Sequence, residues 1–279
     1  PHPGDVTANV RKILSEYLAC GIDPEKAAIY VQSDVKEVLE LYLYLNMNAY
    51  LGELQRVTSF KEKARKQPEN VNAGLLTYPT LMAADILIHR ADKVPVGKDQ
   101  EQNMEMARKF ARRFNTIYGV EFFPEPQSYS FGGDAIKVPG LDGSGKMGKS
   151  EGNAIYLIDD AATIRKKVMK AVTDSGPTQP NSEKPEAIAN LFTMLKIVSS
   201  ADTYDYFNEK YNACEIRYGD LKKQLAEDIV IFPSPTRERI LAYAADREYM
   251  DKVAREGAEK ARASADKTIR EVRKIIGFN

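Results

Sequence analysis

The sequence lacks several features that mark common classes of protein. Its 279 residues include only two cysteines, Cys20 and Cys214, and two histidines, so the Cys/His spacing of a structural zinc site is not present. No apolar run approaches the roughly 20 residues that cross a membrane, and no secretory signal is visible. Forty basic residues balance forty acidic ones, so no overall positive field points to nucleic acid. These absences are compatible with a reducing, cytoplasmic setting and no membrane.

The first 70 residues have the apolar spacing of helices. Apolar residues from Val6 to Leu18 recur at helical intervals, and Gly21 offers an end to this first helix. The stretch "AAIYVQ" predicts a short buried strand over 27–32. A long second helix is then predicted from about 35 to 65, with Ser33 or Asp34 as its cap.

The middle of the chain predicts a helix, a strand and a second helix joined by tight turns. "TYPTLMAADILIHRA" reads as a helix with Pro79 in its first turn, and "KVPVG" as a short strand, although Pro95 is unusual in a central strand. "KDQEQNMEMARKFARRFNTIYG" predicts the second helix. This alternation is typical of an α/β fold with a parallel sheet, whereas the pattern from Asp159 onward is almost entirely helical.

The stretch from Gly143 to Ser150 spells the phosphate-binding pattern G-x-x-x-x-G-K-S. A P-loop requires a helix that begins at its Gly-Lys-Ser. Here Gly152 and Asn153 follow, both poor helix starters, and the next predicted helix begins near Asp159 or Asp160. The P-loop interpretation is therefore disfavoured. The two lysines of this loop still suit a phosphate, and a solvated basic turn is the alternative.

"KMGKS", at 146–150, is similar to the KMSKS signature of class I aminoacyl-tRNA synthetases. "GLLTYPTLMAADILIHRADKVPVGKDQ", "TSFKEK", "GIDPEKAAIYVQSDV" and "TIRKKVMKAVTDS" together resemble the bacterial tryptophanyl-tRNA synthetases, over nearly the whole chain. The resemblance implies a class I Rossmann-like parallel-sheet catalytic domain over 1–158, which includes a helical connective insertion over about 1–73. An all-helical anticodon-binding domain over 159–279 would follow.

One carboxylate stands out in the helix "LMAADILI". Tyr78, Met82 and Asp85 share a helix face at i, i+4 and i+7. A carboxylate among apolar neighbours is costly unless it is paired. The residues alone leave two possibilities open: Asp85 pairs with His89, Arg90 or a backbone amide, or it accepts a hydrogen bond from a ligand.

The resemblance implies the second possibility, in which Asp85 accepts the indole N–H of tryptophan and selects for that donor. It assigns tryptophan contacts to Tyr78, Met82, Asp85, Ile86, Val94, Val96 and Gln100. It assigns ATP contacts to Gly97, Asp99, Gln100, Lys146, Met147, Gly148, Lys149 and Ser150. Lys63, Lys146 and Lys149 would be catalytic, and Mg²⁺ would enter with ATP rather than in a protein metal site. The alternatives are that Asp99 caps the next helix and that Lys63 is an ordinary partner of a helix C-terminus.

The chain departs from the family pattern in three respects. Gly148 stands where the signature usually has serine, and Lys98 where glutamate is common. No "HxGH"-like motif occurs, and the chain begins without Met, so we expect the family's N-terminal segment to be missing and the chain to be inactive by itself.

The resemblance also implies the partners L-tryptophan, ATP and tRNA(Trp), and a homodimer formed through the first two helices. The stretch "LELYLYLNMNAYL" is apolar over most of its surface, which fits burial against a second subunit. A non-catalytic relative that binds tRNA or dimerises, and a tyrosine-activating enzyme, are the alternatives.

Overall fold

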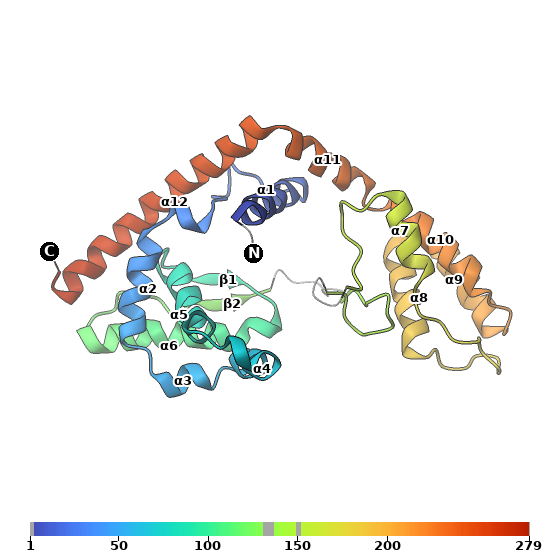
Figure 1. Cartoon of the computed structure of the whole chain (residues 1–279), viewed down its shortest axis with the longest axis horizontal. Coiled ribbons are helices and arrows are strands. Elements are labelled where there is room, and N and C mark those ends of the chain that lie inside the picture. Colours follow the sequence, from blue (N-terminus) through green and yellow to red (C-terminus); the bar gives the residue numbers. More distant parts are fainter. Residues whose placement is uncertain (1–2, 131–136, 149–151, 279) are drawn as a thin grey trace. The chain divides into compact units, whose positions relative to one another are not determined.

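The structure is a computed structural model that describes residues 3–130, 137–148 and 152–278. The chain forms two compact units (Figure 1). Unit 1 comprises Pro1–Ile22 and Asp134–Arg247, and unit 2 comprises Asp23–Gly133 and Glu248–Asn279. The chain therefore passes between the units three times. These bounds describe compactness, whereas the predicted boundary after residue 158 describes function and stays a prediction.

Unit 2 combines helices with a small parallel sheet. Its elements are α2 (Glu37–Met47), α3 (Leu51–Gln55), α4 (Thr58–Lys66), α5 (Ala73–Leu87), β1 (Lys93–Pro95), α6 (Glu101–Tyr118), β2 (Gln127–Tyr129) and nearly all of α12 (Arg247–Ile276). Single 3₁₀ turns lie at Gln32–Asp34, Pro68–Asn70 and Lys98–Gln100. One hydrophobic core joins α2, α5, α6 and the buried face of α12.

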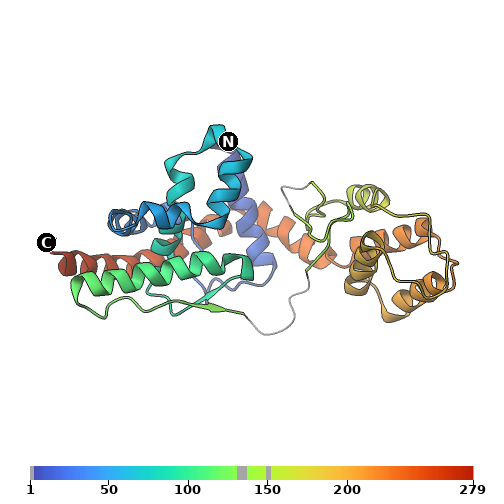
Figure 2. The same ribbon diagram turned by 90° about the horizontal axis from the view of Figure 1, so that it is seen from below.

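The two described strands run parallel, in the register Lys93↔Gln127 and Pro95↔Tyr129. The ladder tolerates Pro95 because neighbouring amides make its bonds: the Gln127 N–H donates to the Asp92 carbonyl at 2.8 Å, and the Val96 N–H to the Tyr129 carbonyl at 3.4 Å. Helix α6 lies along this sheet in both views (Figures 1 and 2). The predicted helix–strand–helix order is confirmed here.

Two predictions for residues 27–65 are wrong. The segment over 27–32 is no strand. It runs irregularly into the 3₁₀ turn Gln32–Asp34, and its backbone at Ile29 packs against Gly257 of α12 instead of pairing with a strand. The predicted long helix is three helices, α2, α3 and α4. Extended backbone at Tyr50 and Val57 (ψ 124° for each) begins the second and third, and burial of Leu54 and Val57 stabilises the bends.

Helix α5 begins earlier than predicted, at Ala73. The Asn72 side chain caps it by accepting the Leu75 N–H at 2.9 Å. Pro79 is therefore the seventh residue of the helix and not part of its first turn. It forgoes one intrahelical hydrogen bond, and it is fully packed in the core of unit 2.

Unit 1 is helical among its described residues. It contains α1 (Pro3–Ala19), α7 (Ala161–Met169), α8 (Glu186–Val198), α9 (Ala201–Asn212), α10 (Tyr218–Ile231) and α11 (Ser234–Ala245). Helix α1 ends as predicted, before Gly21 (φ 99°), and packs against α11, where Arg239 Nε donates to the Ala19 carbonyl at 2.9 Å. None of the helices in the described part of the chain is long and apolar enough to cross a membrane.

Candidate active site

The half-buried carboxylate of Asp85 is held by one neutral side chain. The Gln32 amide nitrogen donates to both carboxylate oxygens, at 2.8 Å each. Burial raises the pKa of Asp85 above its ordinary value, and the hydrogen bonds from Gln32 partly oppose this rise. A carboxylate has about four acceptor positions, so two remain for another donor.

Neither basic neighbour considered from the sequence pairs with Asp85 in the described structure. His89 Nε2 lies 2.9 Å from the Tyr30 hydroxyl, and burial lowers the pKa of this histidine, which favours its neutral form. The Arg90 guanidinium lies over the Phe122 ring, 4.7 Å from its centroid. Arg90 therefore does not neutralise Asp85, and His89 acts on it only through an electrostatic attraction that lowers the pKa of Asp85 and partly opposes the effect of burial.

Apolar residues predicted to contact an aromatic ring pack against the same core as α5. Met82, Val94 and Val96 are partly buried there, and Ile86 is only 8% exposed. Val94 belongs to β1 and Val96 follows it. The fold therefore brings apolar groups from α5 and from the end of β1 into one cluster, at the kind of strand end where α/β proteins bind ligands.

Helix α4 lies beside the first half of α5 and brings two predicted site residues together. The Tyr78 hydroxyl is hydrogen-bonded to the Ser59 hydroxyl. The Lys63 ammonium lies 5.2 Å from the centroid of the Tyr78 ring, a cation–π distance. Lys63 lies in the last turn of α4, as the alternative interpretation requires, yet its ammonium also stands next to a residue predicted to contact tryptophan.

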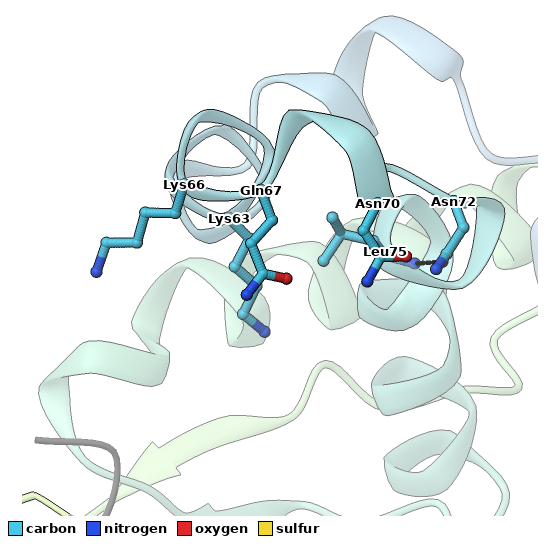
Figure 3. A pocket seen from close by; sticks show the side chains of 6 residues that line it. All are labelled: Lys63, Lys66, Gln67, Asn70, Asn72 and Leu75. Atoms are coloured by element: carbon cyan, nitrogen blue, oxygen red, sulfur yellow. Dashed lines mark hydrogen bonds between the residues drawn. The ribbon is translucent and has the colours of Figure 1, made fainter. Parts of the chain in front are cut away.

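A pocket of about 380 Å³ lies between the end of α4 and the start of α5 (Figure 3). Its lining residues are Lys63, Lys66, Gln67, Asn70, Asn72 and Leu75. Figure 3 shows the Lys63 and Gln67 side chains running alongside one another, whereas Lys66 extends away from them. The volume is within the range of small-molecule sites. Lysine and amide N–H groups are donors that suit anionic oxygens.

The 3₁₀ turn Lys98–Gln100 joins the end of β1 to α6. The Gln100 amide donates to an Asp99 carboxylate oxygen at 3.2 Å and accepts from Asn103 Nδ2 at 2.9 Å. This network fixes which end of the Gln100 amide is the donor. Asp99 does not cap α6, because the N-cap is Gln100 and makes no side-chain cap bond. Lys98 is exposed.

Asn153 holds the backbone of the loop that carries Lys146 and Lys149, which we call the lysine loop. Only 6% exposed, it accepts the Gly148 N–H at 2.9 Å and donates to the Lys146 carbonyl at 3.0 Å. It also donates to an Asp142 carboxylate oxygen at 2.9 Å. Gly140 makes room for this amide, because a Cβ at residue 140 would overlap Asn153 Nδ2 and lie 2.5 Å from the Asp142 carboxylate. The main-chain N–H of Gly148 is therefore held in place by the Asn153 side chain.

The Lys146 side chain is exposed and Met147 is half-buried. Lys149 and Ser150 lie outside the described residues. No helix follows the loop over 152–160, and α7 begins at Ala161 with Asp160 as its cap, where a carboxylate oxygen accepts the Thr163 N–H at 2.6 Å. The P-loop pattern thus lacks the helix it requires in this described stretch.

Gln32, Ser59 and Asn153 are among the residues of these networks that the sequence did not predict. Gln32 is 53 residues from Asp85, and nothing in its local sequence indicates the contact. Ser59 likewise meets Tyr78 only through the packing of α4 on α5. The sequence did hold a local indication for Asn153, because an asparagine directly after a glycine-rich loop commonly bonds the backbone of the turn.

Known proteins resemble this chain over its whole length. A sequence model for the family described as "tRNA synthetases class I (W and Y)" matches residues 3–232. A tryptophan–tRNA ligase of Porphyromonas gingivalis (strain ATCC BAA-308 / W83) is 77% identical over 278 residues, which make up 100% of this chain and 85% of that protein. A tryptophan–tRNA ligase of Listeria monocytogenes serotype 4b (strain F2365) is 41% identical over 272 residues, 96% of this chain and 80% of that protein.

Solved structures agree. A tryptophanyl-tRNA synthetase from Campylobacter jejuni, complexed with ADP and tryptophan, superposes with a TM-score of 0.86 and 33% sequence identity, covering 100% of this chain and 86% of that one. The α/β class with a Rossmann-like part and a helical part is confirmed, as is the resemblance to the bacterial tryptophanyl-tRNA synthetases. The chain belongs to the tryptophan and tyrosine family of class I tRNA synthetases.

Proposed function

We propose that the Asp85 carboxylate selects tryptophan and that the lysine groups stabilise the charge of ATP, within an overall activity of tryptophan–tRNA ligation. That activity, the ATP-dependent joining of tryptophan to its tRNA, follows from the family and from 77% identity with a tryptophan–tRNA ligase along the whole chain. The observation that carries the residue assignment is the Asp85 carboxylate, which is hydrogen-bonded by Gln32 while His89 bonds Tyr30 and Arg90 lies over Phe122.

In the proposed tryptophan site, the indole N–H donates to Asp85. The ring packs against Met82, Ile86, Val94 and Val96, and Tyr78 and Gln100 contact the amino acid end. A ring without a donor leaves the half-buried carboxylate short of a partner, which penalises it. Two observations support this site. The four apolar residues belong to one hydrophobic core, and the bond from Asn103 identifies which end of the Gln100 amide donates.

The first step is attack of a tryptophan carboxylate oxygen on the α-phosphorus of ATP. The bond from this phosphorus to the bridging oxygen breaks, and pyrophosphate leaves. In the second step, a hydroxyl at the 3′ end of tRNA takes the aminoacyl group and AMP leaves. Neither step needs a nucleophilic side chain, so catalysis is positioning and charge stabilisation.

We assign the charge stabilisation to Lys146, Lys149 and Lys63. Gly97, Asp99, Gln100, Met147, Gly148 and Ser150 complete the proposed ATP contacts. Within the described residues, no group of three His, Cys, Asp or Glu side chains could hold a metal ion. Mg²⁺ generally binds nucleotide phosphates with few protein ligands, so it would enter this site on ATP and neutralise part of the pyrophosphate charge.

The activity is tested by pyrophosphate exchange with the intact protein. We expect exchange that depends on tryptophan but not on tyrosine, and transfer of tryptophan to tRNA(Trp). Pyrophosphate exchange that depends on tyrosine would show that the protein activates tyrosine instead of tryptophan. Absence of exchange with either amino acid, in a protein that still binds tRNA, would identify a non-catalytic relative.

We also propose that the enzyme is a cytoplasmic homodimer, with residues 1–158 serving catalysis and residues 159–279 serving anticodon recognition. An apolar stripe on α2 and α3 supports the dimer, because five large apolar side chains there are more than half exposed: Leu39, Leu43, Met47, Tyr50 and Leu51. Exposed apolar surface of this kind marks protein contacts.

Replacing Leu43 with Glu is expected to convert the dimer to a monomer, because it places a charge in the centre of the stripe. Sedimentation velocity measures the change. Leu241→Glu is the matched control, since Leu241 on α11 is similarly exposed (58% against 54%) and lies outside the stripe. A Leu43→Glu protein that sediments as a dimer would show that the subunits meet elsewhere.

A further inference from the structure

A glycine in the interior of α12 allows this helix to touch the segment that carries Gln32. Gly257 is buried. A Cβ at this position would overlap the Ile29 carbonyl oxygen and lie 2.6 Å from the Ile29 carbonyl carbon and 2.9 Å from the Ile29 nitrogen. These are backbone atoms, so no side-chain rotation relieves the overlap. Glycine ordinarily weakens a helix interior, but here it permits an approach that alanine would prevent.

Two further bonds tie α12 to the same region. The Lys260 ammonium donates to the Pro24 carbonyl at 2.9 Å. The Ser264 hydroxyl lies 3.2 Å from His89 Nδ1, and His89 Nε2 bonds the Tyr30 hydroxyl. Positions 257, 260 and 264 follow one another at helical spacing on one face. Helix α12 thus holds residues 24–30 from one side along about two turns.

The contact at Ile29 is close in sequence to Gln32, the residue that binds the Asp85 carboxylate. Ile29 is three residues before Gln32, and the intervening Val31 begins the 3₁₀ turn in which the Asp34 N–H bonds the Val31 carbonyl at 2.9 Å. The two Gln32–Asp85 bonds measure 2.8 Å. A displacement of about 1 Å would lengthen them beyond hydrogen-bonding distance. The backbone position of Ile29 is thus three residues from the side chain that holds Asp85.

We propose that α12 is a positioning element for tryptophan recognition: Gly257 sets the place of the 29–32 segment, and Gln32 then orients the carboxylate of Asp85. This rests on the proposed function, in which Asp85 accepts the indole N–H. By engaging both oxygens, Gln32 holds the carboxylate in place and uses one acceptor position on each oxygen, which leaves the others for the substrate. Gly257 and Gln32 act through Asp85 and do not touch the substrate.

The test uses the intact enzyme with Gly257→Ala, Gln32→Met and the double variant. Each is assayed by pyrophosphate exchange with tryptophan and with its benzothiophene analogue, in which sulfur replaces the ring N–H. For both single variants we expect kcat/KM for tryptophan to fall about tenfold, mostly through KM, and the tryptophan-to-analogue preference to fall by a similar factor. Gly219→Ala on α10, where a Cβ meets nothing within 4 Å, is the control and is expected to change neither.

The double variant tests whether Gly257 acts through Gln32. We expect it to lose little more than the larger single variant, since groups that act on one target are not additive. An unchanged preference in folded Gly257→Ala, or losses that multiply in the double variant, would overturn the proposal.

If Gly257→Ala does not fold, Ser264→Ala carries the test of α12. It removes only one hydroxyl, and the preference for tryptophan should fall about threefold; no change would overturn the proposal. A wild-type enzyme with no preference for tryptophan over the analogue would instead refute the role of Asp85 itself.

Discussion

Asp85→Asn is expected to reduce kcat/KM for tryptophan activation by about 10²-fold or more, since a charged hydrogen bond to the substrate is lost at a half-buried site. The loss should appear chiefly in KM. The asparagine must also satisfy the Gln32 amide, and doing so with its single oxygen turns its own N–H groups towards the indole donor. Steady-state pyrophosphate exchange over a range of tryptophan concentrations measures the effect.

Asp92→Asn is the matched control for this experiment. Asp92 carries the same charge in the same unit, but its side chain is exposed in the turn before β1. We expect its kinetic constants to remain within about twofold of the wild type, as for ordinary surface changes. A wild-type KM for tryptophan in Asp85→Asn would remove the basis of the proposed selectivity.

Lys146→Ala is expected to lower kcat of tryptophan activation by about 10²–10³-fold, with the affinity for tryptophan unchanged. Its positive charge is proposed to act on the pyrophosphate that becomes more negative in the transition state, and loss of one such group has effects of this size. Single-turnover formation of the adenylate measures the rate, and equilibrium titration measures tryptophan binding.

Lys196→Ala serves as the control, because Lys196 is exposed on α8 and lies outside the lysine loop. Equal losses of rate and tryptophan affinity in Lys146→Ala would argue against a role in charge stabilisation. Lys149 carries the same expectation from the sequence, and it lies outside the described residues.

Local pattern was sufficient for much of the fold. The local pattern predicted α1 and α6, "KVPVG" predicted β1, and the helical character from Asp159 onward was also predicted. It failed where tertiary contacts override local preference. The segment over 27–32 has the composition of a buried strand, yet its backbone at Ile29 packs against α12. The breaks at Tyr50 and Val57 carry neither Gly nor Pro, so no local signal divides α2, α3 and α4.

In the candidate site too, the sequence predicts what depends on local pattern and misses what depends on tertiary contacts. The residues "LMAAD" pointed to Asp85 because a carboxylate in an apolar helix demands an explanation. Its partner Gln32 could not be predicted, since the two meet only when the irregular segment folds onto α5. The partner is neither of the basic residues nor the backbone amide that the sequence suggested for Asp85, and a neutral amide leaves the negative charge of the carboxylate in place.

The hydrogen bonds of Asn153 also bear on how the lysine loop can evolve. Position 148 contributes its main-chain N–H to Asn153, so exchange of the usual serine for glycine removes a hydroxyl without disturbing that bond. Position 140 does not tolerate a side chain in the same way, because any Cβ there would overlap the Asn153 side-chain amide that holds the loop. The two positions therefore meet different steric demands: residue 148 gives only its main-chain N–H to Asn153, whereas a side chain at 140 would displace the Asn153 amide.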